Sequence, residues 1–346
     1  MASASTDQTI RLSDVANQRE LAKLRGHLLE VWSVAFSPDG KNLASGCKDG
    51  SVFYWSAAPK RKEQTFMILP ARLSGLSFSP DSKSFVASDT DGMVGTWDTD
   101  SVRETAKLSE LGTNNFCIAI STAGNFLFAG DTSGTIKVWD FAAQRRVTNL
   151  VGLTAPVRRL KYVSQGKILA ATDGSNNTVK LWDTETWREK ISLKLNRNFL
   201  SFAISPDGRT LVTGTSDGTL TIWNSASGRE EVTWKAHKQR VAEIAFSPDG
   251  RILATGSSDG TAKLWDPVTG REVAVLRGHL LGVHSIAFSP DGQRLATGSQ
   301  GKEAVKLWDI ATRREVATLE GQGIWNWHRS SARRSKNFVA SIAPGC

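Results

Sequence analysis

The sequence predicts an all-β fold in which one four-stranded antiparallel sheet is repeated along the chain. The pattern is clearest between Arg240 and His279, where three turn signals separate four short apolar runs. Such closely punctuated runs of valine, isoleucine, leucine and threonine are typical of a meander. A tryptophan ending the third run recurs every 41 to 43 residues, as Trp55, Trp97, Trp139, Trp182, Trp223, Trp265 and Trp308. Because one such sheet cannot bury both faces, the copies are expected to stack in a closed array.

The three turns of this unit contain the residue types that tight turns need. In SPDG at 247–250, proline supplies the fixed φ of a type I turn and glycine closes it. Asp-Gly at 259–260 fits a hairpin turn that requires positive φ. PVTG at 267–270 makes the third break. The order strand, turn, strand therefore predicts four strands per unit.

These repeats resemble the WD-repeat family of β-propellers. The motifs that carry the resemblance are Gly-His at 26–27 and 278–279, SPDG at 37–40, 205–208, 247–250 and 289–292, and Trp-Asp at 97–98, 139–140, 182–183, 265–266 and 308–309. They cover nearly the whole chain. The resemblance implies a closed β-propeller of four-stranded antiparallel blades around a central channel. It does not name a function, since one fold hosts many.

We expect a single domain over residues 1–346, with complete repeat units at about 28–319. Residues 9–14 and 20–25 match the third and fourth strands of a further blade, with Ser13 in the tryptophan position and Met1 to Asp7 aligned on the second strand. Residues 324–330 and 337–343 match the first and second strands, and we expect them to pair with 9–14 and 20–25. The prediction is eight blades, the closing one built from 1–27 and 320–346, with seven blades as the alternative.

Composition narrows the classes of partner and compartment. The net charge of +9 favours anionic partners. The basic residues are spread through every repeat, however, as on solvated sheet edges that resist edge pairing. Three distant cysteines, Cys47, Cys117 and Cys346, indicate a reducing compartment. With no secretory signal at 1–14 and no apolar run of membrane-spanning length, we expect a cytoplasmic protein that does not bind membranes.

The resemblance also implies buried hydrogen-bond networks, because many blades of the family join a histidine, a serine or threonine, an aspartate and a tryptophan. Two sets are complete in this chain: His27, Ser45, Asp49 and Trp55, and His237, Thr255, Asp259 and Trp265. We expect the aspartate to accept hydrogen bonds from both the histidine and the indole. The seventh unit keeps His279, Thr297 and Trp308, but Gln-Gly-Lys at 300–302 replaces its aspartate turn.

No catalytic arrangement is recognisable. The histidines at 27, 237 and 279 fall in the Gly-His frame, and His284 and His328 have no acidic or cysteine partner at metal-ligand spacing. The aspartates sit in turns, where they bond their own backbone, and the glycines mark hairpins instead of a phosphate-binding loop. We therefore expect a non-catalytic protein with no cofactor and no metal site.

The candidate binding residues form a ring. The second residue of the first strand of each unit is Trp32, Ser74, Phe116, Arg158, Leu200, Ala242, His284 or Trp325. In the family, this position and the one two residues earlier face the channel entrance, and the earlier set includes Arg72 and Arg240. Aromatic and arginine side chains are common interface anchors, although they could instead pack inward on neighbouring blades. The predicted partner-binding residues are Trp32, Phe116, Arg158, Leu200, His284, Trp325, Arg72 and Arg240.

The expected function is a scaffold that holds a partner protein or peptide on the channel-entrance face. The arginines suit an acidic partner, and the chain would act as a monomer or within a larger complex. One alternative is binding of nucleic acid or another polyanion through the basic surface, which requires cations clustered on one face and a steep salt dependence. Another is hydrolysis at a metal in the channel, as in some other propellers. That reaction requires converging acidic residues, whereas this ring contains arginines and aromatics.

Overall fold

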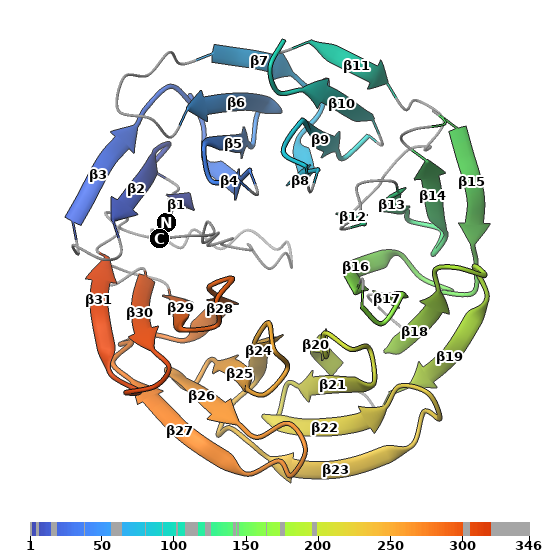
Figure 1. The fold of residues 1–346 in the computed structure, drawn as a ribbon, viewed down its shortest axis with the longest axis vertical. Helices are drawn as coiled ribbons and strands as arrows, with labels where there is room; N and C mark the ends of the chain where they lie inside the picture. The colour runs from blue at the N-terminus through green and yellow to red at the C-terminus, as the bar shows by residue number, and fades with distance from the viewer. Residues whose placement is uncertain are drawn as a thin grey trace, which may run out of the picture.

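In the computed structural model, eight antiparallel β-sheets form a ring around a central channel (Figure 1). The structure describes residues 2–4, 7–14, 19–37, 39–56, 64–79, 81–91, 93–101, 103–107, 117–121, 126–140, 143, 145–163, 165–173, 177–195, 199–299 and 305–319. Seven sheets have four strands that pair in chain order. The fold is therefore an all-β propeller with four-stranded antiparallel blades, as the sequence predicts.

The four strands of each complete blade run from the channel to the outer edge (Figure 1). The innermost strands are β4 Val31–Phe36, β8 Leu73–Phe78, β12 Cys117–Ile120, β16 Val157–Val163, β20 Phe199–Ile204, β24 Val241–Phe246 and β28 Val283–Phe288. The second strands are β5 Asn42–Cys47, β9 Ser84–Asp89, β13 Phe126–Gly130, β17 Ile168–Asp173, β21 Thr210–Thr215, β25 Leu253–Ser257 and β29 Arg294–Ser299. The third strands are β6 Ser51–Ser56, β10 Val94–Asp98, β14 Ile136–Asp140, β18 Thr178–Asp183, β22 Thr219–Asn224, β26 Thr261–Trp265 and β30 Val305–Asp309. The outer strands are β7 Gln64–Ile68, β11 Glu104–Lys107, β15 Arg145–Leu150, β19 Glu189–Lys194, β23 Glu230–Lys235, β27 Glu272–Arg277 and β31 Glu315–Leu319.

The turn between the first two strands of a blade is held by its own side chains. In β24–β27, Ser247 Oγ donates to Asp249 Oδ1 at 2.6 Å and accepts from the backbone N–H of Ile252 at 2.9 Å. Gly250 closes the turn with a φ of +73°, a left-handed conformation that favours glycine. The second unit has Ser82 in this position at a φ of +61°. These local bonds set the register in which the second strand starts.

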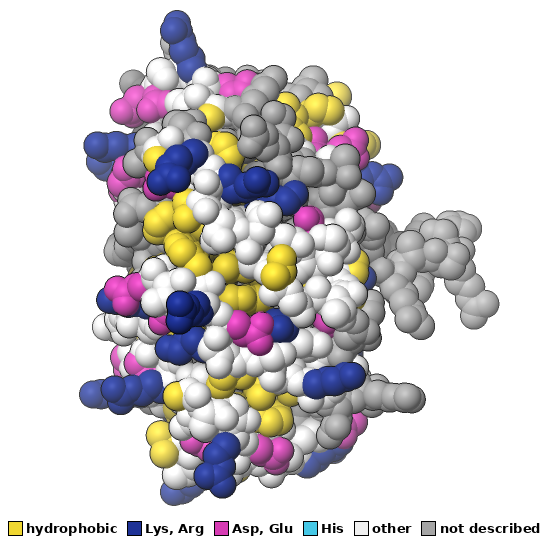
Figure 2. Space-filling model, turned by 90° about the vertical axis from the view of Figure 1, so that its right-hand side faces the viewer, with side chains coloured by type: hydrophobic (Ala, Val, Ile, Leu, Met, Phe, Trp, Pro, Cys, Tyr) yellow, Lys and Arg dark blue, Asp and Glu magenta, His cyan; other side chains and the backbone are white. Residues whose placement is uncertain are grey.

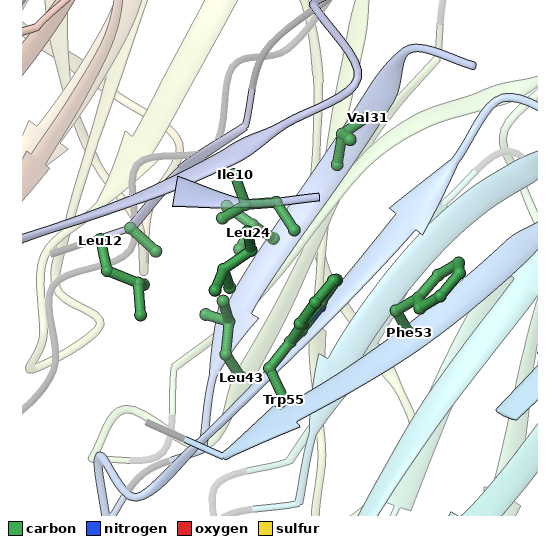
Figure 3. Packing of buried hydrophobic residues seen from close by; sticks show 9 residues of the cluster. Ile10, Leu12, Leu24, Val31, Leu43, Phe53 and Trp55 are labelled. Carbon is green, nitrogen blue, oxygen red and sulfur yellow. The ribbon is translucent and has the colours of Figure 1, made fainter. Parts of the chain in front are cut away.

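The blades are held together by apolar packing of one sheet face on the next. In one such cluster, Trp265 and Leu253 of β24–β27 pack with Val212 and Leu220 of the preceding blade. Figure 3 shows the equivalent contact between the N-terminal sheet, residues 2–24, and β4–β7. The labelled side chains are Ile10, Leu12, Leu24, Val31, Leu43, Phe53 and Trp55. Each large apolar side chain buried in this way contributes roughly 1.5–3 kcal/mol.

The eighth sheet has three described strands, β1 Ala2–Ala4, β2 Ile10–Asp14 and β3 Arg19–Leu24. β2 pairs with β3 on one edge and with β1 on the other. The β2–β3 ladder shifts register between Leu12 and Ser13, as the β26–β27 ladder does at Trp265, so Ser13 occupies the tryptophan position. In the part of the chain that is described, no ladder joins this sheet to β28–β31.

The position of β1 corrects one expected pairing. The edge of β2 that the sequence analysis assigned to residues 337–343 is taken by β1, which pairs with Ile10 to Leu12. The reason is proximity in the chain: a short turn joins the two strands, with Thr9 N donating to Asp7 Oδ1 at 3.1 Å, and a short loop loses little entropy on closing. Residues 320–346, including the predicted strands 324–330 and 337–343, lie outside the described residues. Among the described residues, seven blades are complete.

Candidate functional site

The channel-entrance face is marked by a repeated irregularity at the start of the inner strands. In six blades, the ladder between the first and second strands skips the second residue of the inner strand. Such a β-bulge leaves the extra residue unpaired and turns its side chain away from the regular alternation. The six bulge residues are Trp32, Ser74, Arg158, Leu200, Ala242 and His284. They occupy the same ring of positions that the sequence spacing indicated.

The loops before β8 and β24 lie on this same face. Thr90 N donates to Arg72 O at 2.8 Å, and Ser258 N donates to Arg240 O at 3.2 Å. These bonds tie the loop to the turn between the second and third strands of its blade. Arg240 Nε also donates to Ser258 Oγ at 2.7 Å, which orients its guanidinium. The arginines two residues before the bulges therefore belong to the channel-entrance face.

Four of the predicted partner-binding side chains can be placed. Arg72, Arg158 and Arg240 are exposed, and His284 is half-buried. Burial, followed by the positive charge of Arg240, lowers the pKa of His284 below its ordinary value, which disfavours the charged imidazolium. The side chains of Trp32 and Leu200, and the whole of Phe116 and Trp325, lie outside the described residues. The described part of the ring is thus mainly basic.

Exposed apolar side chains on the same loops were missed by the sequence analysis. Leu28 is 78% exposed before β4, Leu280 is 85% exposed before β28, and Val151 is 65% exposed before β16. A signal for two of them was present, because Leu-Leu directly follows Gly-His at both 26–27 and 278–279. Exposed leucines next to a basic ring are typical of a surface that binds a protein.

A charged cluster inside the channel was also missed. Arg159 Nη1 of β16 donates to Glu243 Oε2 of β24 at 2.9 Å. Lys161 Nζ lies 4.0 Å from Glu243 Oε1, 3.5 Å from Ile244 O and 5.7 Å from the centre of the Phe202 ring in β20. In the ring, β20 stands between β16 and β24 (Figure 1). The contacts from β16 to Glu243 and Ile244 therefore reach past the neighbouring inner strand to the one after it.

The charged groups of this cluster are largely withdrawn from water. The exposed fractions are 26% for the side chain of Arg159, 36% for Lys161 and 20% for Glu243. Burial lowers the pKa of Lys161 from its ordinary value; the charge of Arg159 lowers it further and that of Glu243 opposes the shift. The spacing could have revealed the cluster, since Arg159 and Glu243 hold the third inner-strand position two repeats apart.

The network in β24–β27 is centred on Thr255. His237 Nε2 lies 2.7 Å from Thr255 Oγ1, and Trp265 Nε1 donates to the same oxygen at 2.8 Å. Asp259 Oδ2 lies 3.1 Å from His237 Nδ1. The indole therefore bonds the threonine, and the expectation that it bonds Asp259 is wrong. The geometry explains this: Trp265 pairs with Leu253, and Thr255 is two residues further along the same face of β25.

The His27 network differs at its aspartate. His27 Nε2 lies 2.7 Å from Ser45 Oγ, and Trp55 Nε1 donates to that oxygen at 2.7 Å. His27 Nδ1 lies 3.1 Å from Ser51 Oγ, which donates to Asp49 Oδ1 at 2.6 Å, so a serine relays the contact. Burial lowers the pKa of His27 to about 4, although the charge of Asp49 opposes this. A neutral histidine held inside a blade orients neighbouring strands and is turned away from any ligand.

The described residues also bear on metal binding, membrane insertion and thiol chemistry. Within the described ranges, no three His, Cys, Asp or Glu side chains are grouped so that they could hold a metal ion. The placed residues also include no helix with the length and apolarity needed to cross a membrane. Cys47 and Cys117 are free thiols. The chemistry on the channel-entrance face is therefore that of exposed arginines and leucines.

Curated relatives match short stretches of the chain. Coronin-7 of Mus musculus is 50% identical over 52 residues, which are 15% of this chain and 6% of that protein. WD repeat-containing protein VIP3 of Arabidopsis thaliana is 34% identical over 79 residues, 19% of this chain and 25% of that protein. The periodic tryptophan protein 2 homolog of Schizosaccharomyces pombe is 35% identical over 83 residues, 23% of this chain and 10% of that protein. The chain thus spans a quarter or less of each.

Two longer comparisons address the fold and the family. The crystal structure of the computationally designed Ika8 protein is 25% identical with a TM-score of 0.73, covering 92% of this chain and 91% of that one. Residues 270–309 match the profile of the WD domain, G-beta repeat, and residues 1–266 match the profile described as the IFT122 first beta-propeller. Since that match spans most of the chain, the chain belongs to the IFT122 first β-propeller family of WD-repeat proteins.

Proposed function

We propose that this propeller is a non-catalytic scaffold that binds a partner protein or peptide on its channel-entrance face. The observation that carries the proposal is the set of six bulges at equivalent positions. A bulge adds nothing to the pairing within a blade, yet it directs a side chain out of the ladder. Repeated around the ring, it presents varied residues from several blades to one ligand.

The chemistry of the face supports a protein ligand. The exposed guanidinium of Arg158 can form a planar two-point contact with a carboxylate, and Arg72 and Arg240 stand on the neighbouring ring of positions. The exposed leucines at 28 and 280 add apolar contact area beside them. Arginine with apolar anchors is the usual composition of an interface centre.

The test is to change two ring residues together, Trp32→Ala and Arg158→Ala. We expect the affinity for partners captured from an extract to fall by about 2 kcal/mol or more, a loss of roughly 30-fold, because such residues act as interface hot spots. The Tm should stay close to that of the parent, since the backbone positions are fixed by the fold. Binding is measured by titration calorimetry with a purified captured partner.

A matched control lies on the opposite face, where the other two turns of each blade meet. Lys167 O there accepts from Thr184 N at 2.9 Å, and Val268 is 81% exposed. The pair Lys167→Ala and Val268→Ala removes one cation and one apolar side chain, as the test pair does. It should leave binding unchanged. Retained binding by the Trp32 and Arg158 variant, or its unfolding, would reject the proposal in favour of the outer edges.

Polyanion binding is the second candidate, suggested by the net charge of +9. Figure 2 shows one side of the ring, where lysine and arginine side chains are interspersed with aspartate and glutamate. Some lysines are already paired with a carboxylate, as in Lys180 with Glu189 at 2.6 Å and Lys263 with Glu272 at 2.8 Å. These features favour the protein partner. Binding of a labelled oligonucleotide that weakens steeply with salt would favour the polyanion instead.

We also propose that the chain forms one eight-bladed domain, closed by residues 1–27 and 320–346. Support comes from β1–β3, which occupy an eighth position in the ring and have no described innermost strand (Figure 1). Deleting residues 320–346 should then speed hydrogen exchange in β2 and β3 more than in the other blades. Unchanged exchange in these strands after the deletion would argue against this closure.

A further inference from the structure

We infer that Arg159 and Lys161 form a receptor inside the channel for one acidic side chain of the bound partner, below the bulge residue Arg158. This inference rests on the proposed function, because it names the chemistry of the segment that the channel-entrance face would bind. It adds residues that the ring of bulge positions does not include. It also assigns a role to Glu243, as the group with which the ligand competes.

The inner strands of the other blades show how unusual these residues are. At the third inner-strand position the seven residues are Ser33, Gly75, Cys117, Arg159, Ser201, Glu243 and Ser285. At the fifth position they are Ala35, Ser77, Ala119, Lys161, Ala203, Ala245 and Ala287. Small side chains fit beneath the next inner strand: Ser201 Oγ donates to Val241 O at 3.0 Å. Arg159 and Lys161 are much longer, and their charged ends reach Glu243 and the carbonyl of Ile244 in β24.

The charges of the cluster do not balance. The described inner strands contain three cations, Arg158, Arg159 and Lys161, and one carboxylate, Glu243. Two positive charges are therefore in excess, and Arg159 and Lys161, which are mostly withdrawn from water, share the single carboxylate of Glu243. Partly buried charge that is incompletely paired costs free energy, whereas charge-assisted hydrogen bonds to an incoming carboxylate offset that cost. The cluster is thus suited to receive one more anion.

The size and surroundings of the cluster favour a carboxylate on a peptide over a nucleic acid. Glu243 stands among the cations and would repel a row of phosphates, while a single carboxylate can approach from the side of Arg158 and Lys161. The exposed leucines 28 and 280 on the surrounding loops suit apolar neighbours of that acidic residue. The ligand expected is a segment in which an aspartate or glutamate is flanked by bulky apolar side chains.

A purely structural role makes the opposite prediction for Glu243. If the ion pair only clamped β16 to β24 across β20, loss of either partner would loosen the channel and weaken any binding there. If the cations receive a ligand, Glu243 competes for them, and its removal should strengthen binding. Glu243→Gln keeps the size and loses the charge, so it separates the two roles by the sign of its effect.

The experiment selects short random peptides displayed on phage against the immobilised full chain. The selected peptides are then synthesised and titrated by calorimetry into the parent, Lys161→Met, Glu243→Gln and the opposite-face control Lys167→Met. We expect the selected peptides to be rich in aspartate or glutamate. Affinity should fall about tenfold in Lys161→Met, rise several-fold in Glu243→Gln and stay unchanged in Lys167→Met. Methionine is close to lysine in length but has no charge, so it removes the ammonium group that lies 5.7 Å from the centre of the Phe202 ring.

A second arm changes only the peptide, so it holds even if a protein variant fails to fold. Replacing the acidic residue by its amide should weaken binding to the parent about tenfold, with a smaller effect in Lys161→Met. Three outcomes would overturn the receptor: equal binding of the amide peptide, weaker binding by Glu243→Gln, or displacement of the selected peptides by an oligonucleotide. If the Trp32 and Arg158 variant does not bind the peptides, but the changes at Lys161 and Glu243 leave the affinity unaltered, the receptor is rejected and the proposed function stands. Insensitivity to all four changes would reject the proposed function as well.

Discussion

The blades β24–β27 and β12–β15 share a strand order but differ in the hydrogen bonding of the buried tryptophan. Trp265 donates its indole N–H to Thr255. Trp139 Nε1 is equally buried and has no hydrogen-bond partner among the described residues. The reason is a single side chain, because Ala129 lies two residues beyond the partner of Trp139, where β25 has Thr255. Both tryptophans are less than 10% exposed. Apolar burial and strand pairing therefore suffice for a blade, and the network adds stability.

The largest effect that we expect to distinguish a blade with a buried histidine from β12–β15 is a loss of stability in acid. Burial lowers the pKa of His27 to about 4 from its ordinary value of 6.5. Between these pH values, the unfolded chain binds a proton that the folded chain does not bind. The free energy of unfolding should therefore fall as the pH drops from 6.5 to 4, by about 3 kcal/mol from this residue. Below pH 4 both states are protonated at His27 and its contribution is fully lost.

The measurement is urea unfolding at several pH values, for the parent and for His27→Gln. The variant should lose part of the pH dependence in that window, because glutamine does not titrate. The blade β12–β15 has no histidine in its strands, so its amides provide an internal reference in hydrogen exchange. The same pH slope in both proteins would mean that His27 is charged in the folded state.

The next effect is a matched pair of substitutions in the turn between the second and third strands. Asp259 Oδ2 accepts from Lys238 N at 3.0 Å and lies 3.1 Å from His237 Nδ1, so Asp259→Ala removes both contacts and leaves the buried Nδ1 with only Thr261 Oγ1, at 3.2 Å. We expect a loss of about 2 kcal/mol in the free energy of unfolding. Ser133 occupies the equivalent position in β12–β15 but is exposed, and its hydroxyl bonds only the turn beside it, at Asp131 and Thr135.

Ser133→Ala should therefore cost less than about 0.5 kcal/mol, as is usual for an exposed side chain. Both variants are compared with the parent by chemical denaturation at pH 7. Equal losses at positions 259 and 133 would show that the histidine network adds nothing to β24–β27. A loss of unfolding free energy at position 259 alone would support the view that the network adds stability to a blade that folds without it.

Much of this architecture could be predicted because it is local and repeated. The tryptophan spacing and the SPDG turns depend on residues close in sequence, and the spacing located the first strand and the tryptophan of the third strand in each complete blade. The split N-terminal blade was also visible in the alignment of Met1 to Asp7, although its pairing was assigned to 337–343. That error arose from preferring a distant partner over a neighbour that a short turn brings into place.

The candidate site was less predictable because it depends on geometry between blades. The spacing found the ring position of Arg158, but a bulge has no residue signature of its own, so its exposure could not be derived. The contact of Arg159 with Glu243 joins residues that are two repeats apart and passes a third strand. Most inner strands have a small residue at the third position. A comparison of that position in all the inner strands would have shown that Arg159 and Glu243 are exceptions.

The smallest expected effect is a gain of stability from giving β12–β15 the acceptor that it lacks. Ala129→Ser would place a hydroxyl oxygen where Thr255 and Thr213 stand in their blades. The case of Thr213 is informative, because it accepts from Trp223 Nε1 at 2.8 Å. The position of its blade that corresponds to His237 is Leu195, so the bond forms without a histidine.

The new hydroxyl would accept from Trp139 Nε1 and needs an acceptor for its own proton. The carbonyl of Lys137 is in place, because Ala129 pairs with Lys137 as Thr297 pairs with Lys306, and Thr297 Oγ1 lies 3.4 Å from Lys306 O. The free energy of unfolding should rise by up to about 1 kcal/mol, the net value of one buried hydrogen bond. Ala129→Cys is the matched control, since a thiol fills similar space and accepts weakly. If serine and cysteine shift the denaturation midpoint equally, the change comes from volume, and the unpaired indole of β12–β15 costs the blade little.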